Sequence, residues 1–237
     1  MARILFVLSS ASHLNLSDGQ QIATGFWAQE FIPPYEAFRQ AGHTVAVATP
    51  DGRPAVLDAL CLAPEFHADD PTRPARLQGA LAALPDWRRP LAVTAVTAGD
   101  YDALFFPGGH GPVADMADDP AIGRLVGRIH AAGGLIGAIC HGPAGLLPAR
   151  QEGRWLFEGY RMTCFSPEEE RLAGLAERLP WLLADRLAAL GGQLSFAPPG
   201  QAHVVSDRHL FTGQNPASAI GLAQAMLKAL SSLGPGL

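Results

Sequence analysis

Long apolar runs, dense basic clusters and closely spaced cysteines are all missing from this chain of 237 residues. No run approaches the roughly 18 to 20 apolar residues of a membrane helix, so we expect no membrane span. The 17 Lys and Arg residues are outnumbered by 22 Asp and Glu residues, which gives a formal net charge of −5. This balance argues against nucleic acid or an anionic membrane as a partner and favours small molecules or proteins.

Only three cysteines are present, Cys61, Cys140 and Cys164. They are too few and too far apart for a disulfide framework or for the paired close ligands of a zinc motif, and this usage favours a reducing, cytoplasmic location. The eight histidines show no ligand spacing such as His-Glu-x-x-His. The sequence therefore predicts no metal site and no cofactor.

Short apolar runs bounded by turn residues alternate with helical patterns along the chain. The runs are residues 4–8, 45–48, 103–106 and 135–139, and they are typical of strands buried on both faces of a mostly parallel sheet. Helices are predicted at residues 36–41, 122–132, from Pro167 onward, 180–190 and 216–230. With 48% hydrophobic and 16% charged residues, the chain is expected to form one α/β domain over residues 1–237.

A proline-rich stretch interrupts this alternation at about residues 50–90. Its prolines are Pro54, Pro64, Pro71, Pro74 and Pro85. We predict an irregular insertion with one helix around residues 76–84, which caps the site or builds an interface.

The most informative segment is residues 135–144, where an apolar strand meets Cys140, a small residue and Pro143. This pattern has the form of a nucleophile elbow with cysteine in the serine position. A residue on such a turn lies beyond the carboxyl ends of the strands, where open α/β sheets place their ligands. Unpaired N–H groups of the following helix are expected to lower the thiol pKa into the range ~3.5–7.5. Cys61 and Cys164 lack this context and are read as core cysteines.

The glycine loop at residues 108–111 invites two interpretations. Residues 109–114 match the G-x-G-x-x-A dinucleotide fingerprint, but Pro112 stiffens the loop and no acidic ribose partner follows about 20 residues on. The glycines are better explained by the close approach of a backbone N–H to a substrate oxygen, with the N–H of His141 as a second oxyanion donor. His110, which the loop places near the elbow, is a candidate for the substrate pocket.

Residues 138–143, Ala-Ile-Cys-His-Gly-Pro, resemble the elbow of the ThiJ/PfpI superfamily, which is itself similar to class I glutamine amidotransferase domains. Residues 101–111 resemble the strand and glycine loop of that superfamily, residues 162–170 its segment after the elbow, and residues 212–218 its C-terminal turn. The agreement covers nearly the whole chain outside about residues 50–95. The resemblance implies a flavodoxin-like three-layer sandwich with helices on both faces of the sheet. The His-x-Glu unit of true glutamine amidotransferases is absent downstream, which disfavours a glutaminase.

Residues 25–30, Gly-Phe-Trp-Ala-Gln-Glu, resemble the branch that contains small heat-shock chaperones and glutathione-independent glyoxalase III enzymes. That resemblance implies Cys140 as nucleophile, His141 as its base and Glu30 as the acid beside the sulfur. It implies Glu170 as the carboxylate that orients His141, with Glu168 and Glu169 as alternatives. The substrate and oxyanion loop would comprise Gly108, Gly109, His110 and Gly111.

The sequence departs from this branch at two places. The branch often has a His-Pro pair shortly after its first glutamate, whereas residues 31–34 here are Phe-Ile-Pro-Pro. Cys164 stands where glycine or another small residue is expected, and two readings remain open for it, an inert cysteine or a second oxidisable thiol. The first departure removes an imidazole that the branch has near its site.

The resemblance implies an enzyme that converts a small 2-oxoaldehyde such as methylglyoxal to a hydroxy acid through a Cys140 hemithioacetal, without glutathione or metal. Two alternatives remain open. One is a non-enzymatic redox sensor or holdase that binds unfolded client proteins, and the other is a cysteine peptidase or a related hydrolase or hydratase. Because the family is commonly oligomeric, we expect a homodimer.

Overall fold

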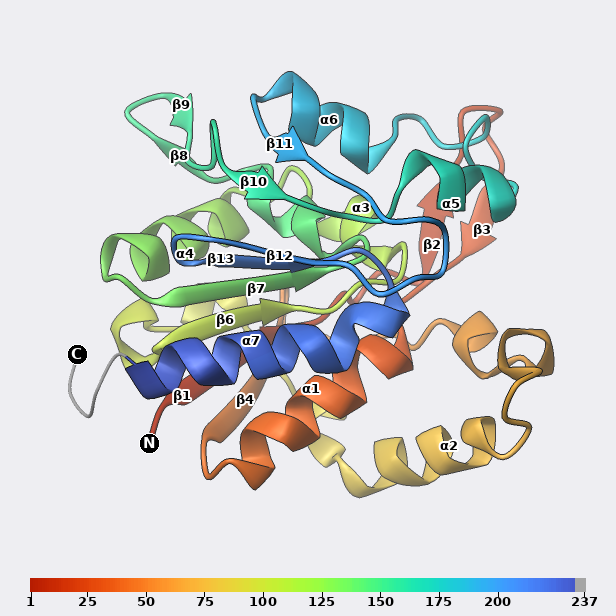
Figure 1. Cartoon of the computed structure of the whole chain (residues 1–237), viewed down its shortest axis with the longest axis horizontal. Coiled ribbons are helices and arrows are strands. Elements are labelled where there is room, and N and C mark those ends of the chain that lie inside the picture. Colours follow the sequence, from red (N-terminus) through yellow and green to blue (C-terminus); the bar gives the residue numbers. More distant parts are fainter. Residues whose placement is uncertain (233–237) are drawn as a thin grey trace.

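The central sheet of the computed structural model, which describes residues 1–232, has seven strands in the order β12-β13-β7-β6-β1-β4-β5 (Figure 1). Neighbouring strands are parallel except for the antiparallel pair β12 and β13. The strands are β1 (Arg3–Val7), β4 (Thr44–Thr49), β5 (Leu91–Ala92), β6 (Ala103–Phe106), β7 (Leu135–Ile139), β12 (Val204–Asp207) and β13 (Leu210–Gly213). The predicted mostly parallel α/β fold is therefore confirmed.

Helices cover both faces of this sheet (Figure 1). They are α1 (Ala28–Gln40), α2 (Arg73–Ala83), α3 (Gly111–Asp115), α4 (Pro120–Ala131), α5 (Pro167–Leu172), α6 (Leu183–Ala189) and α7 (Ala219–Ser232). None of the helices in residues 1–232 combines the length and apolar composition needed to cross a membrane.

Shorter elements connect the sheet and the helices. Seven 3-10 turns are present in residues 1–232: η1 (Ala59–Leu62), η2 (Pro64–His67), η3 (Pro85–Arg88), η4 (Val93–Ala95), η5 (Ala98–Asp100), η6 (Gly142–Leu146) and η7 (Pro216–Ser218). Three small two-stranded pairs complete the described chain: β2 (His13–Asn15) with β3 (Gln21–Ala23), β8 (Arg150–Gln151) with β9 (Arg154–Trp155), and β10 (Arg161–Met162) with β11 (Gln193–Leu194).

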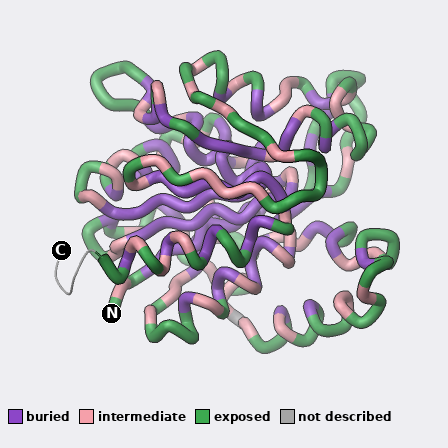
Figure 2. Tube along the Cα trace, in the orientation of Figure 1, coloured by how far each residue is buried: buried purple, intermediate pink, exposed green. Residues whose placement is uncertain are grey.

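Apolar residues on alternate sides of each central strand build two cores, one on each face of the sheet. In β1, Ile4 and Phe6 pack with α1 and α7, whereas Leu5 and Val7 face the side of α4. Successive side chains of a strand point to opposite faces, so a continuous apolar run supplies both cores at once. Figure 2 shows the resulting concentration of buried residues in the central strands.

The first long helix begins earlier than predicted. Residues 36–41 were the expected helix, but α1 starts at Ala28 and contains Pro33 and Pro34. Each proline lies inside the helix and removes one backbone N–H from its hydrogen bonds. The buried side chains of Phe31, Tyr35 and Phe38 recur at helical spacing and anchor one face against the sheet. Glu30 consequently lies in the first turn of the helix.

The predicted insertion at about residues 50–90 folds into η1, η2, α2 and η3 and packs beside α1. Its helix, α2, begins at Arg73 and ends at Ala83, close to the predicted 76–84. The exposed side chain of Phe66 meets Trp27 edge to face, with 5.6 Å between ring centroids. The segment therefore borders the start of the helix that carries Glu30.

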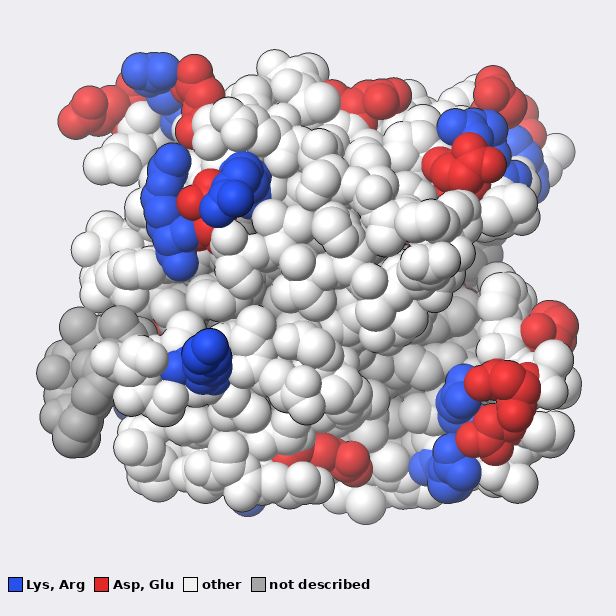
Figure 3. Space-filling model, in the orientation of Figure 1, with Lys and Arg blue, Asp and Glu red and all other residues white. Residues whose placement is uncertain are grey.

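Charged side chains lie mostly in small mixed groups on the face drawn in Figure 3. Arg76 pairs with Asp70 and Arg186 pairs with Asp118, both at less than 3 Å.

Candidate active site

Cys140 occupies a strained turn directly after strand β7. Its φ is 60°, a left-handed conformation that is rare for a residue with a side chain. The turn is held on both sides, because the N–H of Cys140 donates to the carbonyl of Gly213 at 2.9 Å and its carbonyl accepts from Phe165 at 2.9 Å. A side chain at Gly142 would come within 2.0 Å of the carbonyl oxygen of Phe106. These contacts build the predicted elbow and fix the direction of the sulfur.

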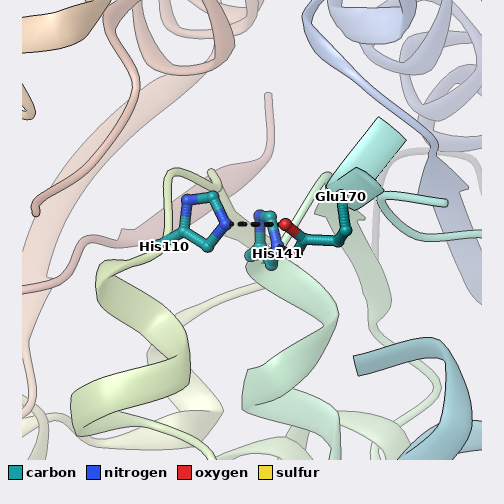
Figure 4. Close-up of side chains that lie close together, drawn as sticks. All are labelled: His110, His141 and Glu170. Atoms are coloured by element: carbon teal, nitrogen blue, oxygen red, sulfur yellow. Dashed lines mark hydrogen bonds and ion pairs between the residues drawn. The ribbon is translucent and has the colours of Figure 1, made fainter. Parts of the chain in front are cut away.

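A thiol, an imidazole and a carboxylate form a continuous chain at this elbow. The sulfur of Cys140 lies 3.3 Å from Nδ1 of His141, and Nε2 of His141 lies 2.5 Å from Oε1 of Glu170. All three side chains are buried. Figure 4 shows that His110 approaches the same carboxylate, with Nε2 at 3.2 Å from Oε2 of Glu170.

The structure distinguishes among the three consecutive glutamates at the start of α5. Glu169 closes a capping box with Ser166 and also accepts hydrogen bonds from Gln214, Asn215 and the N–H of Gly200. Glu168 is half exposed and pairs with Arg171. Only Glu170, among these three, reaches His141.

The contacts of Glu170 define which nitrogen of His141 carries a proton. Burial by itself would raise its pKa, but contact with His141 and His110 outweighs burial and holds the pKa of Glu170 well below its usual range. Burial lowers the pKa of His141, and the neighbouring His110 lowers it further. An ionised carboxylate only accepts hydrogen bonds, so Nε2 of His141 carries the proton and Nδ1 presents its lone pair to the sulfur.

Glu30 lies on another side of the same sulfur. It is fully buried, and its Oε2 accepts from the N–H of Gly108 at 2.8 Å. Burial raises the pKa of Glu30 from 4.5 to about 8, although its interactions with Cys140 and Gly108 oppose the rise. Glu30 is therefore protonated at neutral pH and can donate a proton to a group at the sulfur.

The expectation of a lowered thiol pKa is wrong for this structure. Burial raises the pKa of the Cys140 thiol well above its usual value, and the carboxyl of Glu30 adds to the rise. The element after the elbow is η6, a five-residue 3-10 turn, so the α-helix whose N-terminus was expected to stabilise the thiolate is not there. The sulfur therefore depends on His141 for its deprotonation.

The glycine loop closes the site from strand β6. Gly109 has φ +85°, and its N–H donates toward the sulfur of Cys140. A side chain at Gly111 would come within 2.4 Å of Oγ of Ser9, so the loop packs directly against the end of β1. The described site thus brings together all eight residues singled out in the sequence: Cys140, His141, Glu30, Glu170, Gly108, Gly109, His110 and Gly111.

Gly108 lies against both Glu30 and Cys140 and has no room for a methyl group. A Cβ there would lie 2.6 Å from Oε2 of Glu30 and 2.7 Å from Cβ of Cys140. We expect Gly108→Ala to lower the free energy of unfolding by about 1–3 kcal/mol and to displace one of the two groups from the other. Urea denaturation measures the first effect, and the rate of alkylation of Cys140 by iodoacetamide measures the second.

Gly127→Ala is the matched control for that substitution. Gly127 lies inside α4, and a Cβ there would meet no atom within 4 Å. The same change should therefore stabilise the protein by up to about 1 kcal/mol, through the higher helix propensity of alanine. Equal effects of the two substitutions would contradict the close packing at Gly108.

The chain as a whole is similar in sequence to known proteins. Residues 21–229 match the DJ-1/PfpI family. The glutathione-independent glyoxalase HSP31 of Saccharomyces cerevisiae is 28% identical over 242 residues, which cover 97% of this chain and 98% of the relative. The glutamine amidotransferase-like class 1 domain-containing protein 1 of Bos taurus is 34% identical over 146 residues, which span 61% of this chain and 66% of that relative.

The fold has close counterparts among solved structures. Glyoxalase III from Candida albicans superposes with a TM-score of 0.81, at 24% identity, over 96% of this chain and 97% of the other. This similarity supports the three-layer α/β architecture.

Proposed function

The chain belongs to the DJ-1/PfpI family, and on that premise we propose that it is a glutathione-independent glyoxalase that converts a small 2-oxoaldehyde such as methylglyoxal to the hydroxy acid. The observation that carries the proposal is the arrangement around one sulfur. Cys140 has an imidazole base at 3.3 Å on one side and, by burial, a protonated carboxyl on another. The 28% identity to the yeast glyoxalase over nearly the full length of both chains also supports it.

The first half of the reaction uses this arrangement directly. As the sulfur of Cys140 adds to the aldehyde carbon, Nδ1 of His141 takes the thiol proton, and Glu170 stabilises the imidazolium that forms. The carbonyl oxygen becomes a hydroxyl when Glu30 donates its proton, with the N–H of Gly109 as a further donor to the developing charge. The product is a neutral hemithioacetal bound to Cys140.

The second half moves one hydrogen between adjacent carbons. Glu30, now a carboxylate, removes the proton from the former aldehyde carbon while the imidazolium of His141 protonates the neighbouring carbonyl oxygen, which gives an enediol. Glu30 then returns its proton to the neighbouring carbon, and the hydroxyl on the sulfur-bearing carbon gives its proton to His141, which leaves a thioester. Water then attacks the thioester carbonyl, the carbon–sulfur bond breaks, and lactate and the thiol are released. Hydrogen and oxygen balance with one water per turnover, and no redox partner is consumed.

The proposal is tested with purified, freshly reduced wild-type protein and methylglyoxal. We expect methylglyoxal to disappear and an equal amount of lactate to form, without glutathione and after removal of metal ions by a chelator. A sample alkylated at its thiols serves as the control and should be inactive. Absence of lactate from the reduced protein would overturn the glyoxalase assignment and favour the non-enzymatic alternative.

Three further expectations from the sequence remain predictions. They are a homodimer, a cytoplasmic location and binding of unfolded client proteins. The client-binding alternative would need an apolar surface, and the exposed apolar side chains within residues 1–232 include Leu60, Phe66 and Leu172. The raised pKa of the thiol makes rapid oxidation of Cys140 less favourable than expected for a redox sensor.

A further inference from the structure

The carboxylate of Glu170 joins two imidazoles, and the proposed reaction uses only one of them. Nε2 of His141 lies 2.5 Å from one oxygen of the carboxylate, and Nε2 of His110 lies 3.2 Å from the other. Figure 4 shows the two rings converging on Glu170 from different elements. One ligand atom from each residue lies within 4.8 Å of the others. Two imidazole nitrogens and one carboxylate oxygen form a ligand set that zinc accepts in proteins.

We propose that Zn²⁺ binds between His110, His141 and Glu170 and reversibly inhibits the enzyme by taking the nitrogen of His141 that lies opposite Cys140. The inhibitory part rests on the proposed function, whereas the binding part does not. No sequence motif joins these three residues as metal ligands, because they come from the glycine loop, the elbow and helix α5.

The distances in the cluster are close to those that zinc requires. Zinc–nitrogen bonds of about 2.0–2.1 Å place the ligand atoms of a tetrahedral site about 3.3 Å apart. The two imidazoles contact different oxygens of Glu170, His110 at 3.2 Å and His141 at 2.5 Å. With one ligand atom per residue, all three atoms lie within 4.8 Å of one another, so side-chain shifts of about 1.5 Å or less reach the tetrahedral spacing. The side chain of His110 is 16% exposed, against 1% for His141, so ions and solvent reach the cluster from the His110 side.

His141 cannot bind zinc through Nε2 and act as the base for Cys140 at the same time. A neutral imidazole has one N–H and one lone pair. In the structure Nε2 of His141 donates to Glu170, which leaves the lone pair of Nδ1 facing the sulfur at 3.3 Å. Zinc at Nε2 needs the lone pair there, so the proton must move to Nδ1. His141 could then no longer accept the proton of Cys140.

The thiol of Cys140 takes no part in the proposed zinc site. Cys140 and Glu170 contact opposite nitrogens of the His141 ring. An ion bound at Nε2 therefore lies on the far side of the ring from the sulfur, and Cys140 is not one of its ligands.

The test is a titration of metal-free protein with ZnCl₂ in competition with a chromophoric chelator. We expect one equivalent of zinc per chain, with a Kd at or below about 10 μM. His110→Ala should weaken binding by about tenfold or more, and so should His110→Gln, which keeps a donor to Glu170 but lacks the imidazole. Cys140→Ser should bind zinc as the wild type does. His130→Ala, which alters a histidine bonded to Tyr160 on another part of the fold, should change neither zinc affinity nor turnover.

Cobalt absorption and turnover complete the test. Co²⁺ bound in place of zinc should show no thiolate charge-transfer band, and zinc should suppress methylglyoxal turnover in proportion to occupancy, with full recovery after chelation. Binding that is absent, that is unaffected by both His110 variants, or that disappears in Cys140→Ser would overturn the site. Binding without inhibition would overturn its regulatory effect. Failure of metal-free wild type to turn over methylglyoxal would instead overturn the proposed function, while the zinc titration would still decide the site.

Discussion

Replacement of Cys140 by serine should lower methylglyoxal turnover by about 10³-fold or more, with little change in stability. Serine preserves the shape of the side chain at the strained elbow, where the backbone contacts to Gly213 and Phe165 hold the turn. Its hydroxyl is a far weaker nucleophile than a thiol, and a single imidazole at His141 cannot compensate. The measurement is lactate formation at saturating methylglyoxal, together with the midpoint of urea denaturation.

Cys61→Ala is the matched control for the loss of a thiol. Cys61 is buried in the core beside α1 and α2, and burial raises the pKa of its thiol to about 12. We expect this variant to lose some stability through the small cavity it creates but to keep its turnover. A Cys140→Ser protein that retains more than about a tenth of wild-type turnover would remove Cys140 from the role of nucleophile.

Glu30→Gln should make the protein both less active and more stable. The pKa of the Glu30 carboxyl is about 4.5 in the unfolded chain and about 8 in the folded protein. As the pH rises from 4.5 toward 8, the unfolded chain loses this proton and the folded protein keeps it, so ionisation favours unfolding. Relative to the glutamine variant, the wild type should therefore lose about 3 kcal/mol of stability between about pH 5 and pH 8.

The activity of Glu30→Gln should fall by about 10²- to 10⁴-fold, because the amide cannot donate or remove a proton in the reaction. Urea denaturation at several pH values measures the stability difference, and lactate formation measures the activity. Glu36→Gln, which removes an exposed carboxyl from the same helix, should follow the wild type in both. A stability difference between wild type and Glu30→Gln that does not grow with pH would show that Glu30 is ionised in the folded protein.

The apolar runs of β1, β4, β6 and β7 were predictable because strands buried on both faces need nearly every residue to be apolar. Strand β13 was missed. Its four residues, Leu210 to Gly213, include a threonine and a glycine, and such a short mixed run resembles a turn. Yet Gly213 accepts the N–H of Cys140, so a strand that the sequence did not reveal helps to hold the reactive residue in place.

Three glutamates were candidates for the carboxylate that orients His141, and the sequence could have excluded one of them. Ser166 and Glu169 have the spacing of a capping box, in which the glutamate reaches back to the helix start. That pattern assigns Glu169 to the end of α5 and makes it unavailable to His141. The choice between Glu168 and Glu170 still required the structure, because it depends on which face of the helix meets the elbow.

The sequence by itself determined the alternation of strands and helices and the elbow at Cys140, because each depends on a local pattern. The roles of His141 and Glu30 were implied only by the resemblance of residues 138–143 and 25–30 to known proteins, and they remain predictions. The tertiary structure alone decided the proton states and the contact of His110 with Glu170. The thiol and the Glu30 carboxyl share one buried space, so their pKa values depend on solvent exclusion by segments far apart in the chain. His110 and His141 meet because they follow the carboxyl ends of the adjacent parallel strands β6 and β7, and helix α5 brings Glu170 to the same edge of the sheet.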